Sequence, residues 1–203
     1  MHVEVVEFGS ANCRWDLVES YLRHRRNVFI GQKRWSLVSC GALEFDQYDV
    51  LPAAVYVVAH SGGKVIGGAR LLRCDTRIGT GPTVYSYMIR DAARGVISLP
   101  RDVCWDEPPD DAESWELTRL LTVKPSMAVV KSILDAANAY LARHKAQRCL
   151  FLGPQGFMRM AQNFGYDPQP LGDVVRNDDG AFLAFACPVR HDALQPLEGV
   201  SDE

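Results

Sequence analysis

Apolar residues recur along the chain both in runs with the period of a β-strand and in stripes with the period of a helix. Alternating or continuous apolar runs rich in valine, leucine and aromatic residues predict strands. The turn Ser61-Gly62-Gly63 joins two of these runs into a predicted hairpin. The predicted strands are His2–Phe8, Ala53–His60, Lys64–Arg73, Trp115–Val123, Cys149–Leu152 and Ala181–Val189.

Three other segments place apolar residues three and four positions apart, which predicts amphipathic helices. The second of them follows Ser126, a favourable N-cap residue, and the third stops at Gly165. They span Asn12 (or Ser10) to about Phe29, Ser126 to about His144, and Phe157–Phe164. Because a hairpin comes first and strands later alternate with helices, the order predicts an α/β or α+β domain. Such a domain has a mixed sheet with helices on both faces.

Length and composition are those of one globular domain. Of the 203 residues, 47% are hydrophobic and 23% are charged, so neither a disordered chain nor a collagen-like repeat fits. We expect residues 1–190 to form this domain and the polar residues 191–203 to form a flexible tail. The N-terminus is too acidic for a secretory signal, and no apolar run approaches the length of a membrane span. Six cysteines without a CxxC spacing favour a cytoplasmic protein with reduced thiols.

The charge of the chain narrows its partners. A formal net charge of −3 at pH 7 is unfavourable for a general nucleic-acid binder. The sequence contains no phosphate-loop, GxSxG or HExxH motif, which leaves no signal for a nucleotide phosphate site, a serine hydrolase or a zinc site. Residues 124–159 differ from the rest, because they hold six basic residues and one acid in an otherwise acidic chain. A basic stretch of this kind favours an anionic partner.

Several charged residues occupy positions where the pattern requires apolar ones. Arg25 lies in the apolar stripe of the first predicted helix, and Arg70 shares a strand face with apolar residues. Glu116 and Arg119 lie in SWELTRLLTV, the most strand-like segment of the chain. Residues three apart face opposite sides of a regular strand, but a β-bulge between them turns both to one side. Such departures from a pattern are typical of functional sites.

The segment EFDQYD supplies carboxylates that these arginines need. Buried arginines require acidic partners. The candidates are Glu44, Asp46 and Asp49, which could pair with Arg25, Arg70 and Arg119. The simpler readings stay open: a solvated acidic turn, structural ion pairs, or, for Arg25, a side chain whose stem covers apolar surface at a helix end. If the acids and arginines meet, the sequence predicts a buried cluster of charges.

Together these positions resemble the signature of the acyl-homoserine-lactone synthases, which make autoinducers in bacterial quorum sensing. RNVFIGQKRWSL is similar to the family's first segment, EFDQYD to its acidic segment and GGARLL to its arginine strand. WELTRLLTV is similar to its Glu-x-Ser-Arg strand, with Thr118 at the serine position. The likeness extends over about residues 2–189, and its eight positions are Arg25, Phe29, Trp35, Asp46, Asp49, Arg70, Glu116 and Arg119.

The resemblance implies a GNAT-like fold, a three-layer sandwich in which a twisted mixed sheet has helices on both faces. It also implies the synthesis of an N-acyl-L-homoserine lactone from S-adenosylmethionine and an acyl thioester, with release of methylthioadenosine. The acyl donor is an acyl carrier protein or a coenzyme A ester, and the chain lacks the pyrophosphate-binding loop of ordinary GNAT enzymes. S-adenosylmethionine is then a substrate, and the reaction requires neither a cofactor nor a metal.

Each of the eight positions receives a role by this resemblance. Glu116 is the candidate base that deprotonates the amine of S-adenosylmethionine. Phe29 and Trp35 offer aromatic faces to the sulfonium or the adenine. The remaining five are expected to hold the substrate's ammonium and carboxylate and to position one another: Asp46, Asp49, Arg25, Arg70 and Arg119.

The acyl chain is expected to lie between the central strands and the long helix. Phe151 falls, by alignment, where some family members carry a hydroxyl residue that helps to select 3-oxo chains. Phenylalanine cannot donate that hydrogen bond, so we expect an unsubstituted, branched or aromatic acyl group. We further expect Lys124, Lys131 and Arg159 to dock the anionic donor. The predicted pocket residues are Leu121, Val123, Val130, Leu134, Leu150, Phe151, Leu152 and Met158.

Two alternatives remain at the level of sequence. The first is an ordinary GNAT-type acyltransferase that acts on a different amine, which would form an amide without releasing methylthioadenosine. The second is a non-catalytic homologue that binds a ligand with the same fold and does not turn it over.

Overall fold

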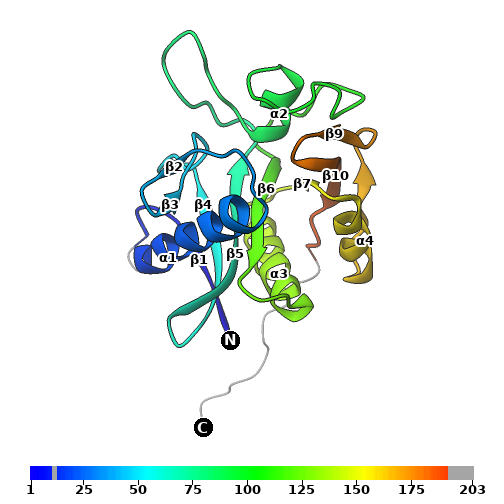
Figure 1. The fold of residues 1–203 in the computed structure, drawn as a ribbon. Helices are drawn as coiled ribbons and strands as arrows, with labels where there is room; N and C mark the ends of the chain where they lie inside the picture. The colour runs from blue at the N-terminus through cyan, green and yellow to red at the C-terminus, as the bar shows by residue number, and fades with distance from the viewer. Residues whose placement is uncertain (11–12, 192–203) are drawn as a thin grey trace.

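The computed structural model describes residues 1–10 and 13–191, and all but the first residue of the predicted tail lies outside this range (Figure 1). The strands are β1 His2–Val6, β2 Ser39–Cys40, β3 Leu43–Glu44, β4 Val55–Ser61, β5 Lys64–Arg73, β6 Ser114–Thr122, β7 Arg148–Gly153, β8 Gln169–Pro170, β9 Val175–Asn177 and β10 Gly180–Pro188. The helices are α1 Trp15–Arg25, α2 Met88–Ala93, α3 Met127–Arg143 and α4 Gln155–Asn163, and a π-helical segment, Arg26–Gln32, extends α1. No helix among the described residues is long and apolar enough to cross a bilayer.

One eight-stranded sheet forms the centre of the molecule, in the order β1-β4-β5-β6-β7-β10-β8, with β9 also paired to β10. All of its neighbouring strands are antiparallel except β6 and β7, which are parallel and are joined through α3. The pairing of β6 with β7 ends at Leu117 and Phe151, although both strands continue beyond these residues. The two strands therefore diverge in the middle of the sheet and leave a fork between them.

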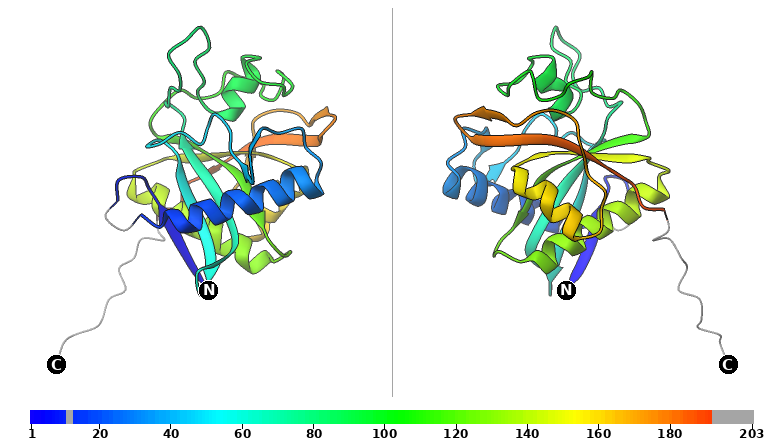
Figure 2. Two further views of the ribbon diagram at one scale, coloured as in Figure 1. Left: turned by 60° about the vertical axis from the view of Figure 1, so that its left-hand side comes forward. Right: turned by 90° about the vertical axis from the view of Figure 1, so that its right-hand side faces the viewer.

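Helices cover both faces of this sheet, as the sequence predicts. Figure 2 shows α1 on one side, and α3 and α4 on the other. Alternate residues of β4 explain how one strand serves both layers. Val57 packs in the core beneath α3, whereas Tyr56 and Val58 pack with α1. The predicted mixed three-layer architecture is confirmed.

Two parts of the local prediction need correction. The first regular helix begins at Trp15 and ends at Arg25, and Phe29 belongs to the π-helical segment that follows. Its predicted cap Asn12 lies outside the described residues, and Ser10 precedes the helix by several positions. The short helix α2 was not predicted, because its first amide groups are bound by a carboxylate from β6, far away in sequence.

Candidate functional site

A bulge in β6 organises the centre of the site. Gly68 pairs with Leu121 and Arg70 pairs with Thr118, so β6 has one residue more than β5 in this interval. Within this interval of β6, Arg119 has a φ of 56°, in the left-handed range that residues other than glycine rarely adopt. The extra residue brings Arg119 to the same side of the sheet as Arg70 and Glu116. The predicted bulge is confirmed.

Arg25 and Arg70 are fully buried, and both bind the aspartates of the predicted acidic segment. Arg25 donates to the two carboxylate oxygens of Asp49 at 2.7 and 3.0 Å. Arg70 donates to Asp46 at 2.6 and 3.3 Å, and its Nη1 lies 2.9 Å from Asp49. Its Nε also donates to the hydroxyl of Thr118 at 3.1 Å. The predicted charge cluster exists, and Arg25 is no surface arginine.

The third arginine enters the same cluster through Glu44, the first carboxylate of the predicted acidic segment. Arg119 donates to Glu44 at 3.2 Å and to Asp46 at 2.9 Å. Glu44 is fully buried, and its other oxygen accepts a hydrogen bond from Arg25. The cluster thus contains all three carboxylates and all three arginines that the sequence predicts for it.

The cluster is electrically balanced and strongly coupled. Burial by itself would raise the pKa of Asp46, but the guanidinium groups of Arg70, Arg119 and Arg25 outweigh burial and hold this pKa well below its usual range. Asp49 accepts further hydrogen bonds from Tyr56 and from the backbone of Asp46. The carboxylates thus accept hydrogen bonds from donors of the protein itself, and the cluster forms a rigid, charged floor beneath the candidate site.

Glu116 lies apart from the arginine contacts and binds backbone instead. Its two oxygens accept hydrogen bonds from the amides of Met88 and Ile89, at 2.9 and 2.8 Å, at the start of α2. Burial raises the pKa of Glu116 to about 7, although both amides and the charge of Arg70 act to lower it. A carboxylate that titrates near neutral pH is suited to general acid–base chemistry.

Phe29 and Trp35 form one aromatic surface beside the cluster. Their rings stack with centres 5.2 Å apart and an angle of 8° between the planes. The indole of Trp35 donates to the carbonyl of Asp179 at 3.1 Å, which fixes the pair to the turn between β9 and β10. The ammonium of Lys33 lies 4.7 Å from the Trp35 ring centre, and Arg119 lies 5.7 Å from that of Phe29. Cations therefore already associate with these rings.

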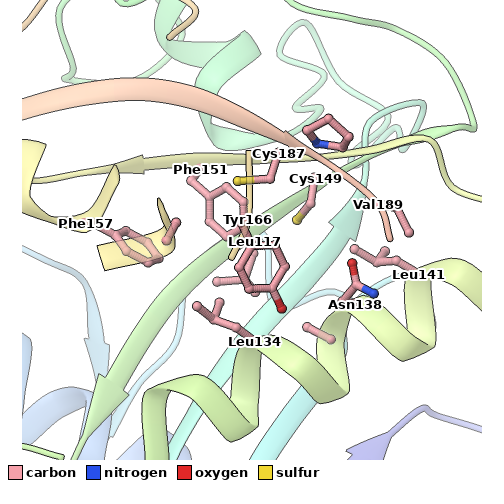
Figure 3. Close-up of a pocket in the computed structure, with 13 residues that line it drawn as sticks. Leu117, Leu134, Asn138, Leu141, Cys149, Phe151, Phe157, Tyr166, Cys187 and Val189 are labelled. Atoms are coloured by element: carbon pink, nitrogen blue, oxygen red, sulfur yellow. The ribbon is translucent and has the colours of Figure 1, made fainter. Parts of the chain in front are cut away.

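A small apolar cavity lies on the α3 side of the fork (Figure 3). Two of the predicted pocket residues, Leu134 and Phe151, line it. Figure 3 shows side chains from α3 opposite those from β7 and β10. The complete lining is Leu117, Leu134, Ala137, Asn138, Leu141, Cys149, Phe151, Phe157, Ala161, Tyr166, Cys187, Pro188 and Val189.

The other predicted pocket residues do not line this cavity. Leu150 and Leu152 pack with α2 on the opposite face, because they alternate with Phe151 along β7. Leu121 and Val123 pack with α1, because the bulge at Arg119 reverses the facing of the residues after it. The last two, Val130 and Met158, pack at the edge of the α3-side core.

The three predicted docking residues lie on separate elements. Lys124 lies in the turn after β6 and Lys131 on α3, where its ammonium is 2.5 Å from Asp135. Arg159, on α4, lines a second, open groove together with Trp105 and other residues.

Comparison with solved structures defines the class of the fold. An acyl-CoA N-acyltransferase from Pseudomonas aeruginosa has a TM-score of 0.61 to this chain, with 11% identity over 92% of this chain and 99% of the other. Its fold is thus shared without close sequence similarity. This likeness agrees with the predicted GNAT-like fold.

Sequence comparison identifies the particular relatives within this class. No family model matches the chain. The acyl-homoserine-lactone synthase of P. aeruginosa is 35% identical over 100 residues, and that of Ralstonia solanacearum is 36% identical over 107 residues. These alignments cover 48% and 50% of this chain, but only 41% and 44% of the relatives' own lengths. That of Acinetobacter nosocomialis is 25% identical over 84% of this chain and 90% of its own.

Comparison with solved structures agrees with the sequence comparison. TofI, in a ternary complex with an inhibitor and MTA, has a TM-score of 0.73 and 25% identity over 93% of this chain and 92% of TofI. BjaI, a CoA-dependent acyl-homoserine lactone synthase with SAM and isopentyl-CoA, has a TM-score of 0.77 and 18% identity. The alignment covers 95% of this chain and 85% of BjaI. The chain is therefore similar, in sequence and in fold, to acyl-homoserine-lactone synthases.

Proposed function

We propose that this protein transfers an acyl group from a thioester to the amine of S-adenosylmethionine and then closes the lactone. One observation carries the proposal. The buried cluster of Arg25, Arg70 and Arg119 adjoins both the Phe29–Trp35 stack and the fork of a GNAT-like sheet. Cation recognition, charge balance and acyl transfer are thereby combined in one place.

The first step forms an amide. The neutral amine attacks the thioester carbonyl, the new C–N bond forms, and the C–S bond breaks to release a thiol. Glu116 takes the proton of the amine, directly or through a water, and the departing sulfur takes a proton in return. The pKa of Glu116, about 7, supports this role, because near neutral pH a large fraction of the molecules have Glu116 deprotonated and able to accept a proton.

The second step closes the lactone. The carboxylate of the methionine moiety attacks its own γ-carbon, the bond to the sulfonium sulfur breaks, and neutral methylthioadenosine leaves. The Phe29–Trp35 stack is suited to hold the sulfonium, as the nearby Lys33 ammonium illustrates. Arg25, Arg70 and their aspartates keep the floor of the site fixed while the charge of the substrate changes.

The acyl chain belongs in the cavity beneath the fork. Both polar side chains of its lining are already occupied: Asn138 exchanges two hydrogen bonds with the backbone of Arg190, each 2.9 Å long, and Tyr166 donates to Asp135. With Phe151 in the wall, the lining offers little to a 3-oxo group. We therefore propose an acyl group without a 3-oxo substituent.

The donor is an acyl carrier protein or a coenzyme A ester, and both are anionic. Arg159 and Lys124 are the proposed docking cations, whereas the charge of Lys131 is partly compensated by Asp135. Both kinds of donor and S-adenosylmethionine are cytoplasmic metabolites, so we place the enzyme in the cytoplasm. The free cysteines agree with a reducing compartment.

The test is the product of the purified protein with S-adenosylmethionine and a series of acyl-CoA and acyl-carrier-protein donors. Mass spectrometry should find an acyl-homoserine lactone and methylthioadenosine in equal amounts. An amide without methylthioadenosine would favour the ordinary GNAT acyltransferase, and binding of S-adenosylmethionine without turnover would favour the non-catalytic homologue. A 3-oxoacyl lactone as the main product would contradict the proposed acyl class.

A further inference from the structure

Asp91 is a buried acid that takes no part in the reaction proposed above. It lies in α2, and its side chain has no exposed surface. Its two oxygens accept hydrogen bonds from the amide of Ser86, at 3.2 and 3.0 Å, and one of them accepts from the hydroxyl of Tyr48 at 2.9 Å. Arg94 lies 3.5 Å away, one turn further along the helix. Such a carboxylate is costly to bury and calls for an explanation.

The start of the helix that contains Asp91 also binds the side chain of Glu116. The amides of Met88 and Ile89 donate to Glu116, while the amide of Ser86 donates to Asp91. Two carboxylates thus bind neighbouring amides of the same turn, one from β6 and one from α2 itself. The direction of the Met88 and Ile89 amides therefore depends on how Asp91 fastens the chain at Ser86.

We infer that Asp91 is a positioning residue for Glu116, because it fixes the turn that enters α2 and places a negative charge beside the Glu116 carboxyl. The inference rests on the proposed function, in which Glu116 accepts the proton of the amine. It adds a residue that acts only through Glu116 and need not touch the substrate.

The charges around Glu116 fit this role. Burial is the largest influence that raises the pKa of Glu116, the two amides and Arg70 lower it, and the charge of Asp91 raises it further. The other titratable groups that interact with Glu116 come from the loops and strands around it: Tyr48, Cys74, Tyr87, Cys104 and Cys149. Asp91 is therefore the acid whose removal should move the titration of Glu116 to lower pH.

The experiment is to titrate Glu116 itself in Asp91→Asn. Protein labelled with ¹³C at glutamate carboxyls is followed by NMR against pH, and the Glu116 signal is assigned by its loss in Glu116→Gln. Asparagine keeps the shape and one acceptor for the Ser86 amide, while the charge and the second acceptor are removed. We expect the Glu116 midpoint to fall by about half a pH unit or more. Asp16→Asn, which removes an exposed acid paired with Arg14, should leave it unchanged.

The pH profile of lactone formation should follow the same shift. The acid limb of kcat/KM should move to lower pH in Asp91→Asn, and Asp91→Glu, which restores the charge, should move it back. An unchanged midpoint in folded Asp91→Asn would overturn the inference and leave Asp91 a structural residue. If Asp91→Asn does not fold, Tyr48→Phe is the second variant. It weakens the charge of Asp91 by removing a donor and should shift the midpoint in the same direction by less, and an unchanged midpoint overturns the inference equally.

These outcomes separate the inference from the proposed function. The NMR midpoint needs no turnover, so it tests Asp91 even if the protein makes no lactone. Conversely, if the midpoint moves but the acid limb of the rate does not, Asp91 acts on Glu116 as inferred and Glu116 is not the base.

Discussion

Arg25, Arg70 and Arg119 each interrupt an apolar pattern, and each is paired to carboxylates that come from a distant part of the chain. An arginine that is buried without such partners would lose several kcal/mol of hydration with no return. The six charges therefore form one unit, in which every arginine is paired with at least two carboxylates. Glu116 is different, because its partners are backbone amides and its pKa of about 7 leaves it only partly ionised at neutral pH.

Removal of the Glu116 carboxyl should abolish most of the activity. Glu116→Ala loses the base, and we expect kcat/KM for lactone formation to fall about 100-fold or more. Glu113→Ala, which removes an exposed glutamate just before the same strand, is the matched control and should retain activity. Turnover at the wild-type rate in Glu116→Ala would exclude Glu116 from the mechanism.

Removal of Arg70 should affect both activity and folding. Arg70→Ala leaves Asp46 and Asp49 without a main partner in a buried place, so the free energy of unfolding should fall by about 3–5 kcal/mol. Urea denaturation measures this, and lactone formation should be nearly lost. Arg73→Ala, at the exposed end of the same strand, should change stability by less than about 1 kcal/mol. Equal effects of the two variants would contradict a special role of the cluster.

Stability should also depend on pH through Glu116. Its pKa is raised from the usual 4.5 to about 7, so between these values the folded state keeps a proton that the unfolded state has lost. The free energy of unfolding should therefore decrease as pH rises from about 4.5 to 7, by up to about 3 kcal/mol from this residue. Relative to Glu116→Gln, the wild type should lose stability over this range and remain level above it. A difference that is constant with pH would contradict the raised pKa.

At the scale of elements, the fork between β6 and β7 and the bulge in β6 determine where each wall of the site lies. The bulge turns Arg119 and Leu121 to the α1 face, so the charge cluster occupies that face. Leu117 and Phe151, the last residues of the parallel pair, face α3 and line the cavity. Because of the bulge at Arg119, the charge cluster and the apolar cavity lie on opposite faces of the sheet.

Filling the cavity should shorten the acyl chain that the enzyme accepts. Ala137 lies in α3 and lines the cavity, so Ala137→Leu adds three carbons to the space of the acyl group. We expect kcat/KM for the longest accepted donor to fall about tenfold or more and that for shorter donors to change less. Ala128→Leu, at an exposed position of the same helix, is the control. A uniform loss for all chain lengths would indicate damage to the fold instead.

At the scale of the whole molecule, the chain is acidic but its second half contains a basic stretch. The structure spreads these cations over α3, α4 and the turns beside them, and it compensates Lys131 with Asp135. Arg159 has no ion pair with any residue that the structure describes, and it lies in the groove with Trp105. Its exposed charge is therefore available to an anionic partner.

Charge reversal should test this docking surface. Arg159→Glu should raise the apparent KM of the acyl donor about threefold or more and leave that of S-adenosylmethionine nearly unchanged. Lys131→Glu should have the same direction and a smaller effect, and Lys64→Glu, at the start of β5, should have none. Added salt should weaken donor use by the wild type, because exposed charges are screened over about 8 Å at physiological ionic strength. KM values that move together for both substrates would exclude this surface.

The sequence by itself determined the elements with strong periodicity and the identity of the charged residues. Buried strands and the long helix show their pattern locally, and the misplaced Arg25 and Arg70 imply a cluster, because a buried charge must be paired. The resemblance of eight positions to the acyl-homoserine-lactone synthases supplied the hypothesis of function.

Only the tertiary structure decided which side of the sheet each residue serves. The bulge at Arg119 reverses the facing of the residues that follow it, so two of the predicted pocket residues, Leu121 and Val123, pack with α1 instead. Likewise, α2 is short and is bound at its start by Glu116, 27 residues further along the chain from Ile89. No local pattern contains such a contact, since it arises only when β6 and α2 are brought together by folding. The roles of Glu44 and Asp91 follow from the same cause, because both depend on partners that are distant in the sequence or on a turn that only the fold defines.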